Sequence, residues 1–171
     1  MKGTTVKNRR VTLILASLTL LALILSLPGS AREAFERGNF YVFSQEFFED
    51  LPKRLTGPGR FRFVFQPVVA ILLGIRDGLG DRRAGRPPYL YGILFHRRHR
   101  GELLQSGFEA VVNLILMGIL LDSIAQWLIL GASYPGAAIV VGPVLITIPY
   151  ALARALANRV AQLRKSLTTS A

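Results

Sequence analysis

Long apolar runs separated by short polar stretches dominate the pattern of this chain. Three of the runs lie within residues 11–28, 105–131 and 137–155, and a shorter one lies within 61–77. A helix needs about 20 residues to cross the hydrocarbon core of a bilayer, and each run approaches that length with its flanks. We therefore predict an all-α polytopic membrane protein with four transmembrane helices at these positions.

The second span is the shortest of the four. Its apolar core, FVFQPVVAILLGI (63–75), has 13 residues. It can cross a bilayer only if the arginines at its two ends extend their side chains toward the headgroups. A three-span arrangement is therefore the alternative prediction.

The first span resembles a signal peptide because basic residues precede its apolar run. The run at 11–27 has 17 residues, however, whereas the apolar part of a signal peptide usually has about 7–15. We interpret it as an uncleaved anchor. Cleavage near PGSA (28–31) is the alternative.

Two connecting segments show amphipathic patterning. Within 29–60, Phe and Leu recur at steps of three or four opposite acidic and amide residues. This pattern predicts helix, either lying in the outer headgroup region or packed on the ends of the spans. Ser30-Ala31-Arg32-Glu33 fits a capping box, so a new helix is expected to begin there. Segment 76–102 is predicted to be a basic loop, with the short apolar run 89–95 dipping into the membrane.

The stretch ASYPG (132–136) connects the third and fourth spans. Pro135-Gly136 at the centre of a turn favours type II geometry, which would make these spans an antiparallel hairpin. If the turn is centred between Tyr134 and Pro135, residues whose numbers sum to about 269 lie at equal depth on the two helices. Asp122 is then expected at the level of Thr147.

The charge distribution gives the chain a predicted orientation. It has 21 Lys and Arg against 10 Asp and Glu, and no Cys. Fifteen of the basic residues fall in 1–10, 76–102 and 154–171, and the other six in 28–62. This positive-inside pattern predicts that both termini are cytoplasmic, and we expect a bacterial inner membrane. No nucleic-acid-binding motif accompanies the basic charge, so nucleic acid is not an expected partner.

The basic segment 76–102 is expected to contact anionic lipids. Clusters of Lys and Arg beside a span attract acidic headgroups by roughly 1 kcal/mol per charge. The side chains assigned to this contact are Arg82, Arg83, Arg86, Arg97, Arg98 and Arg100. His96 and His99 lack further metal ligands nearby, and Gly78-Leu79-Gly80 lacks the third glycine of a dinucleotide-binding motif. No metal and no cofactor are therefore expected.

Three stretches of the sequence resemble a group of small bacterial multi-pass membrane proteins. They are RDGLGDRRAGRPPY (76–89), HRGELLQSG (99–107) and PYALARALANRVA (149–161), with a mid-span acid and a Tyr-Pro-Gly turn between the last two. The resemblance covers residues 60–161, and the RDGL…AGRPPY part is its most specific element. No activity is known for that group, so the resemblance implies the multi-pass topology and no catalytic residues.

Polar side chains interrupt the third span at Glu109, Asn113, Asp122 and Gln126. The first two are expected at the cytoplasmic interface, in a network with Arg76 and Arg154. A lone carboxylate near the middle of a bilayer costs about 2.5–3.5 kcal/mol, so Asp122 is expected to face the protein interior near Gln126 and Thr147. Three roles stay open for Asp122: structural hydrogen bonding between helices, proton or ion conduction, and an oligomer interface.

No nucleophile–base pair, metal cluster or phosphate-binding loop is present in the sequence, so an enzyme is not expected. The leading hypothesis is a small inner-membrane protein that acts by association, as an accessory or scaffold subunit of a membrane assembly. Its partners would be anionic lipids and either other membrane subunits or further copies of itself. The alternative is a minimal oligomeric transporter or proton channel that uses Asp122.

The predicted orientation can be tested by cysteine labelling, because the chain has no Cys of its own. Cysteine at Ser44 should react with a membrane-impermeant thiol reagent added from outside. Cysteine at Ser166 should react only after the membrane is permeabilised, because the basic C-terminal segment is expected inside. Labelling at position 166 in intact cells would contradict this orientation.

Overall fold

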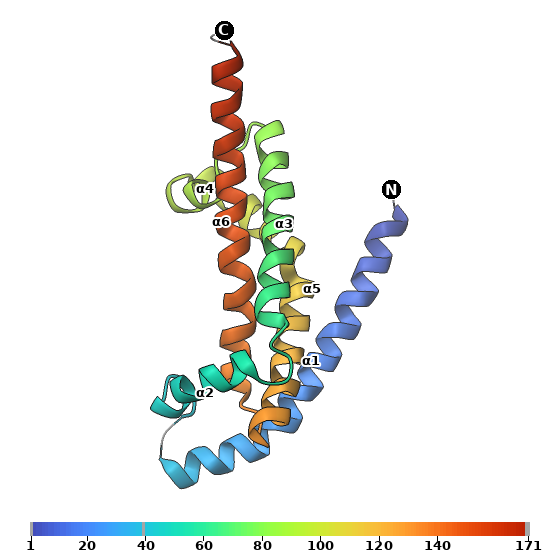
Figure 1. Ribbon diagram of the computed structural model, residues 1–171. Coiled ribbons are helices and arrows are strands. Elements are labelled where there is room, and N and C mark those ends of the chain that lie inside the picture. The colour runs from blue at the N-terminus through green and yellow to red at the C-terminus, as the bar shows by residue number, and fades with distance from the viewer. Residues whose placement is uncertain (1, 39, 170–171) are drawn as a thin grey trace. The chain divides into compact units, whose positions relative to one another are not determined.

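The structure is a computed structural model that describes residues 2–38 and 40–169. All regular structure in these ranges is helical (Figure 1): α1 (Lys2–Arg37), α2 (Gln45–Thr56), α3 (Arg62–Arg83), α4 (Tyr89–Phe95), α5 (Arg97–Leu130) and α6 (Pro135–Thr169). Over the described ranges, α1, α3, α5 and α6 each contain a segment long and apolar enough to cross a bilayer. The prediction of an all-α protein with four candidate spans is therefore confirmed, and α3 qualifies despite its short apolar core.

The segment predicted as a loop over 76–102 is largely helical. α3 continues to Arg83, α4 occupies the apolar run, and α5 already begins at Arg97. Gly78 lies inside α3, in the contact between α3 and α6. The helix stops near Gly85, whose φ of +69° is the left-handed conformation that glycine tolerates at a helix end.

The predicted capping box at Ser30 is wrong, because α1 runs without a break past Pro28. Proline removes one backbone N–H from a helix. On either side of it, the Ser26 hydroxyl donates to the Ala22 carbonyl at 2.7 Å and the Ser30 hydroxyl donates to the Ser26 carbonyl at 3.0 Å. Ser30 is therefore an interior residue of the helix.

The connection between α5 and α6 also differs from the predicted type II turn. Gly131, with φ of +71°, follows the end of α5, and Pro135 begins α6. Proline is favoured in the first turn of a helix because its missing N–H has no partner there. A Cβ placed on Gly142 would meet the backbone of Gly118 and Ile119. Residue numbers at this contact sum to 260 or 261 instead of 269, so the two helices face each other in another register than predicted.

The chain divides into two compact units. The first comprises Met1–Val64 and Asn113–Val144, and the second Phe65–Val112 and Leu145–Ala171. In the first unit, Phe47 of α2 forms a small core with Tyr134 and Ala137, and Tyr41 stacks on Tyr134 with ring centroids 3.7 Å apart. One side of the amphipathic segment therefore packs against the α5–α6 connection.

In the second unit, α3 and α6 lie in direct backbone contact. A Cβ placed on Gly78 would overlap the carbonyl oxygen of Arg154, and one on Gly74 would meet the carbonyl oxygen of Tyr150. Small residues spaced by four along a helix allow this close approach between membrane helices. The contact brings the polar residues of α3 next to those of α6.

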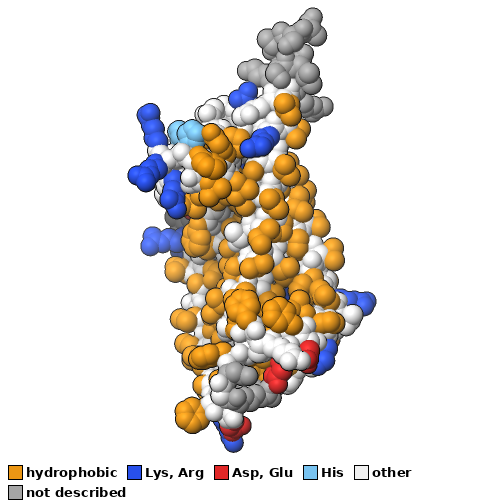
Figure 2. All heavy atoms as spheres, turned by 90° about the vertical axis from the view of Figure 1, so that its left-hand side faces the viewer, with side chains coloured by type: hydrophobic (Ala, Val, Ile, Leu, Met, Phe, Trp, Pro, Cys, Tyr) orange, Lys and Arg blue, Asp and Glu red, His pale blue; other side chains and the backbone are white. Residues whose placement is uncertain are grey.

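The burial pattern is the reverse of that of a water-soluble protein. Large apolar side chains cover much of the surface in Figure 2, whereas Arg54, Arg62 and Arg154 are among the largest fully buried side chains. A surface of this kind suits hydrocarbon, and buried charges require partners inside the protein.

We predict that Gly78→Ala destabilises the protein, because the added methyl group must displace the α6 backbone. The cost of such overpacking is about 1–3 kcal/mol. Gly80→Ala is the matched control, since a Cβ at Gly80 meets nothing within 4 Å. It should be neutral or stabilising by up to about 1 kcal/mol, the usual helix preference for Ala. Thermal unfolding of both variants in mild detergent measures the difference, and equal melting temperatures would contradict the tight contact.

Candidate functional site

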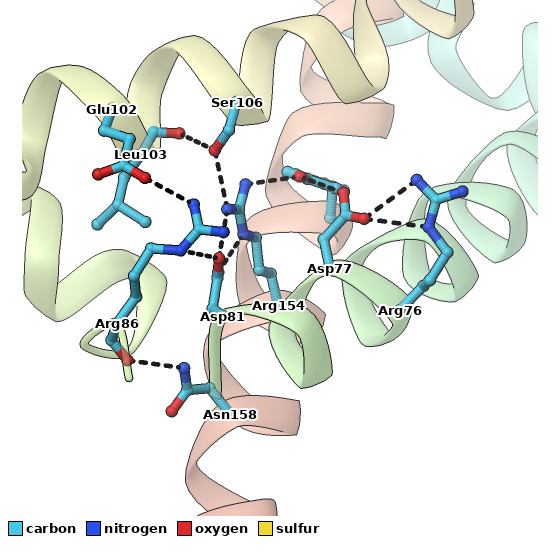
Figure 3. Close-up of polar contacts among 10 residues, drawn as sticks. Arg76, Asp77, Asp81, Arg86, Glu102, Leu103, Ser106, Arg154 and Asn158 are labelled. Atoms are coloured by element: carbon cyan, nitrogen blue, oxygen red, sulfur yellow. Dashed lines mark hydrogen bonds and ion pairs between the residues drawn. The ribbon is translucent and has the colours of Figure 1, made fainter. Parts of the chain in front are cut away.

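A buried arginine in α6 is the centre of the largest polar cluster in the second unit. The Nε of Arg154 donates to Oδ2 of Asp81 at 2.6 Å, and its Nη2 donates to Oδ1 at 2.9 Å (Figure 3). Both side chains are 2% exposed. Two parallel bonds of this kind match the fork of the guanidinium to the carboxylate, which makes the pair strong and directional.

The other donors of Arg154 are satisfied as well. Nη1 donates to the Tyr150 hydroxyl at 2.8 Å, and Nη2 also donates to the Ser106 hydroxyl at 2.9 Å. The Tyr150 hydroxyl in turn donates to Oδ2 of Asp77 at 2.9 Å. The Tyr89 ring lies 4.4 Å from the guanidinium carbon and adds a cation–π contact. All three guanidinium nitrogens are therefore hydrogen-bonded, and a carboxylate compensates the charge, as a buried ion requires.

A second arginine connects this cluster to the segment after α3. Arg86 Nη1 contacts Glu102 at 3.0 Å, and its Nε lies 3.4 Å from Asp81. The Arg86 carbonyl accepts a hydrogen bond from Asn158 of α6 at 3.2 Å. These contacts fix the connection between α3 and α4 against α5 and α6. We call the whole set the Arg154 cluster; its members are Asp77, Asp81, Arg86, Tyr89, Glu102, Ser106, Tyr150, Arg154 and Asn158.

Each of the three stretches on which the predicted resemblance depends contributes to the Arg154 cluster. The first, 76–89, supplies the two aspartates, Arg86 and Tyr89. The second, 99–107, supplies Glu102 and Ser106, and the third, 149–161, supplies the residues of α6. Stretches far apart in sequence thus come together in one polar interior.

A second buried cluster surrounds Asp122 in the first unit. Asp122 is fully buried and forms an ion pair with Arg62, while Nη1 of Arg54 lies 3.6 Å from its Oδ2. Gln126 donates to Asp122 at 2.6 Å and accepts from the backbone N–H of Tyr134 at 2.8 Å. Asp122 is therefore an anchor for the arginines before the second span, and not a lone carboxylate.

The Asp122 cluster extends into α2 through Tyr41. Arg54 donates to the Tyr41 hydroxyl at 3.1 Å, and that hydroxyl donates to Asp50 at 2.8 Å. Burial, reinforced by the hydrogen bond to Asp50, raises the pKa of Tyr41 to about 12. Partial burial works against ionisation of Asp50, but hydrogen bonds from Lys53 and Tyr41 outweigh it and lower its pKa. Tyr41 thus stays a neutral donor, and Asp50 stays charged, at neutral pH.

Several residues that the sequence had grouped have other partners in the structure. Thr147 is exposed and belongs to the second unit, whereas Asp122 belongs to the first. The four residues assigned to an interfacial network each contact a different partner: Arg76 contacts Asp77, Glu109 accepts from Gln105, Asn113 accepts from Thr12, and Arg154 contacts Asp81. The prediction paired these residues by their depth in the membrane. In the structure, each side chain instead contacts a residue of its own helix or of a facing helix.

The arginines assigned to lipid contact fall into two groups. Arg83, Arg97, Arg98 and Arg100 are exposed, which leaves them accessible to headgroups. Arg82 is half-buried, and Arg86 is engaged by Asp81 and Glu102. Arg86 therefore has a structural role that its position in a basic segment did not indicate. Lipid contact by the exposed group stays a prediction.

The sequence did not single out Asp81, Tyr150 or Asn158. A signal was present, because Tyr150, Arg154 and Asn158 are spaced by four and must share one face of a helix. Asp77 and Asp81 have the same spacing in α3. Among the described residues, no group of three or more His, Cys, Asp or Glu side chains could hold a metal ion. The chemistry of both clusters is that of ion pairing and hydrogen bonding between helices.

We predict that Arg154→Leu destabilises the protein by about 3–5 kcal/mol, because it leaves Asp81 buried without its cation. The double variant Arg154→Leu with Asp81→Leu should regain most of that loss, since apolar replacement of a whole buried pair is often neutral. Chemical unfolding in detergent of the wild type, both single variants and the double variant gives the coupling energy. Additive losses would show that the two side chains do not depend on each other.

Comparison with known proteins gives no relative from which a role could be transferred, so the two clusters are interpreted from their own contacts. The resemblance to the bacterial group stays a prediction that depends on the quoted stretches. No protein-family model, no curated protein and no solved structure matches the chain.

Proposed function

We propose that this chain is a small bacterial inner-membrane protein with cytoplasmic termini that acts by association. Its role would be that of an accessory or scaffold subunit of a membrane assembly. The four candidate spans support the multi-pass part of this proposal, and the positive-inside charge pattern supports the orientation.

The observation that carries the proposal is an apolar groove along α3 and α6 in the second unit. Its volume is about 670 Å³, and apolar side chains line it, among them Ile71 and Ile75 of α3 and Leu156 of α6. The α6 wall also contains Ala153, Ala157 and Ala161, spaced by four. Association of helices in membranes depends on close packing at small residues, because lipid provides no hydrophobic driving force between helices. The groove therefore suits a helix of a partner subunit.

The contacts of the buried charges support the same role. Asp81 and Arg154 are engaged with each other, and Asp122 is engaged with Arg54, Arg62 and Gln126. Such pairs hold helices in a defined arrangement and present a constant outer surface. A transporter or proton channel at Asp122 is the alternative, and it would require the carboxylate to leave these partners during each cycle.

The test is site-specific photo-crosslinking in native membranes. Benzoylphenylalanine at Leu156, which lines the groove, should give one discrete protein adduct. The matched control is Phe108, an exposed apolar residue of α5 in the same unit that does not line the groove. Leu at Ala161, which narrows the groove, should abolish the adduct while the melting temperature is preserved.

Lipid adducts alone at both positions would overturn the association proposal. The channel alternative has its own readout in proton flux into liposomes. Flux in the wild type that disappears in an Asp122→Asn variant of unchanged melting temperature would favour that alternative. We expect no flux, and a large loss of stability in Asp122→Asn, because the amide leaves two buried guanidinium groups without their anion.

A further inference from the structure

A second groove in the same unit lies between α4 and the C-terminal part of α6. Pro87 and Pro88 form part of its wall, and His96, Arg159 and Gln162 contribute polar groups; its volume is about 600 Å³. We propose that this groove binds the phosphate headgroup of an anionic phospholipid. The inference depends on the membrane location in the proposed function, and it does not depend on any partner subunit.

Unbalanced positive charge is the first argument for an anionic ligand. Arg159 is exposed, and no carboxylate pairs with it among the residues that the structure describes. The nearby acids on α3 and at the start of α5 are already engaged: Asp77 by Arg76 and Tyr150, Asp81 by Arg154 and Arg86, and Glu102 by Arg86. Three of the four acids in the described part of this unit are therefore already paired with cations, and the fourth, Glu109, accepts a hydrogen bond from Gln105.

The polar wall of the groove is held in place by the Arg154 cluster. Gln162 donates to the side-chain oxygen of Asn158 at 3.1 Å, and Asn158 donates to the Arg86 carbonyl at 3.2 Å. The amide of Gln162 keeps its carbonyl oxygen and second N–H for a ligand. His96 packs near the Tyr91 ring, with centroids 5.0 Å apart. Arg159 and Gln162 lie about one turn apart on α6, and a cation beside an amide suits the oxygens of a phosphate diester.

The apolar surroundings favour a lipid over a free anion. Besides the two prolines, Leu163 lines the groove, and Leu94 and Phe95 of α4 and Val160 of α6 are exposed close by in sequence. The volume lies within the range of about 300–1,000 Å³ that small-molecule sites occupy, which is room for a headgroup and its glycerol. Figure 2 shows a histidine and basic side chains beside apolar ones on the face that carries α4.

This site differs from the diffuse contact predicted for the basic segment. Arg97, Arg98 and Arg100 are exposed and do not line the groove. Charges on an open surface attract any anionic headgroup and contribute in similar amounts. A built groove predicts instead that one arginine matters much more than its equally charged neighbours.

The experiment is native mass spectrometry of the full-length protein in mild detergent, with phosphatidylglycerol or phosphatidylcholine added. The wild type should retain one phosphatidylglycerol in preference to phosphatidylcholine. Arg159→Gln should reduce that retention at least tenfold, the loss expected for a charge-assisted hydrogen bond. Arg98→Gln is the matched control, since it removes the same charge outside the groove, and it should reduce retention by no more than the roughly fivefold effect of one charge on an open surface. Gln162→Leu, which keeps the size of the side chain, should also weaken retention.

Equal losses in Arg159→Gln and Arg98→Gln would overturn the site and show a diffuse electrostatic contact. Displacement of the lipid by inorganic phosphate at millimolar concentration would also overturn it, because the ligand would then be a free anion. Failure of the crosslink at Leu156 has no bearing on these results, so the two proposals can fail separately. Unchanged melting temperatures of the variants confirm that the fold is preserved, as expected for the exposed Arg159.

Discussion

The cost of burying charge in a low-dielectric interior is the constraint on which the rest of this structure depends. An unpaired ion there costs several kcal/mol, so each buried arginine needs a carboxylate close to it. Arg154 and Asp81 meet this requirement with two bonds in the second unit, and Asp122 meets it with Arg54 and Arg62 in the first. Close backbone contact at Gly78 is what lets the first pair form, because it brings α3 and α6 near enough for short side-chain bonds.

The two clusters use the same chemistry in different ways. The Arg154 cluster joins residues of α3, α5 and α6 with the segment after α3, and it is built around a bidentate pair. The Asp122 cluster joins a span to α2, and Tyr41 extends it toward Asp50, whose side chain is partly exposed. One cluster therefore stabilises helices against one another, and the other attaches a short amphipathic helix to a span.

The sequence predicted well what depends on local pattern. The four candidate spans follow from apolar runs, which can be recognised in the sequence without knowing which residues are in contact in the fold. It failed where tertiary contact decides. Segment 76–102 was predicted to be a loop, yet Gly78 packs α3 against α6, and Pro135-Gly136 was predicted to be a turn but begins α6. Asp122 was recognised as needing partners, yet its arginines lie more than fifty residues earlier in the chain, where no periodicity could point to them. The sequence assigned Arg154 to an interfacial network. Its partner Asp81 lies 73 residues earlier in the chain, where no local pattern connects the two.

That separation in sequence has a consequence for biosynthesis. Chains emerge from the ribosome in order, so α3 is made 73 residues before the arginine that its Asp81 requires. During that interval, Asp81 lacks its bidentate partner, and Arg86, which lies 3.4 Å from it in the folded structure, is the cation of the Arg154 cluster already made. Asp122 is in the opposite situation, since both of its arginines precede it. The first unit can neutralise its buried carboxylate as soon as α5 is made, whereas the second cannot do so before α6 has been inserted.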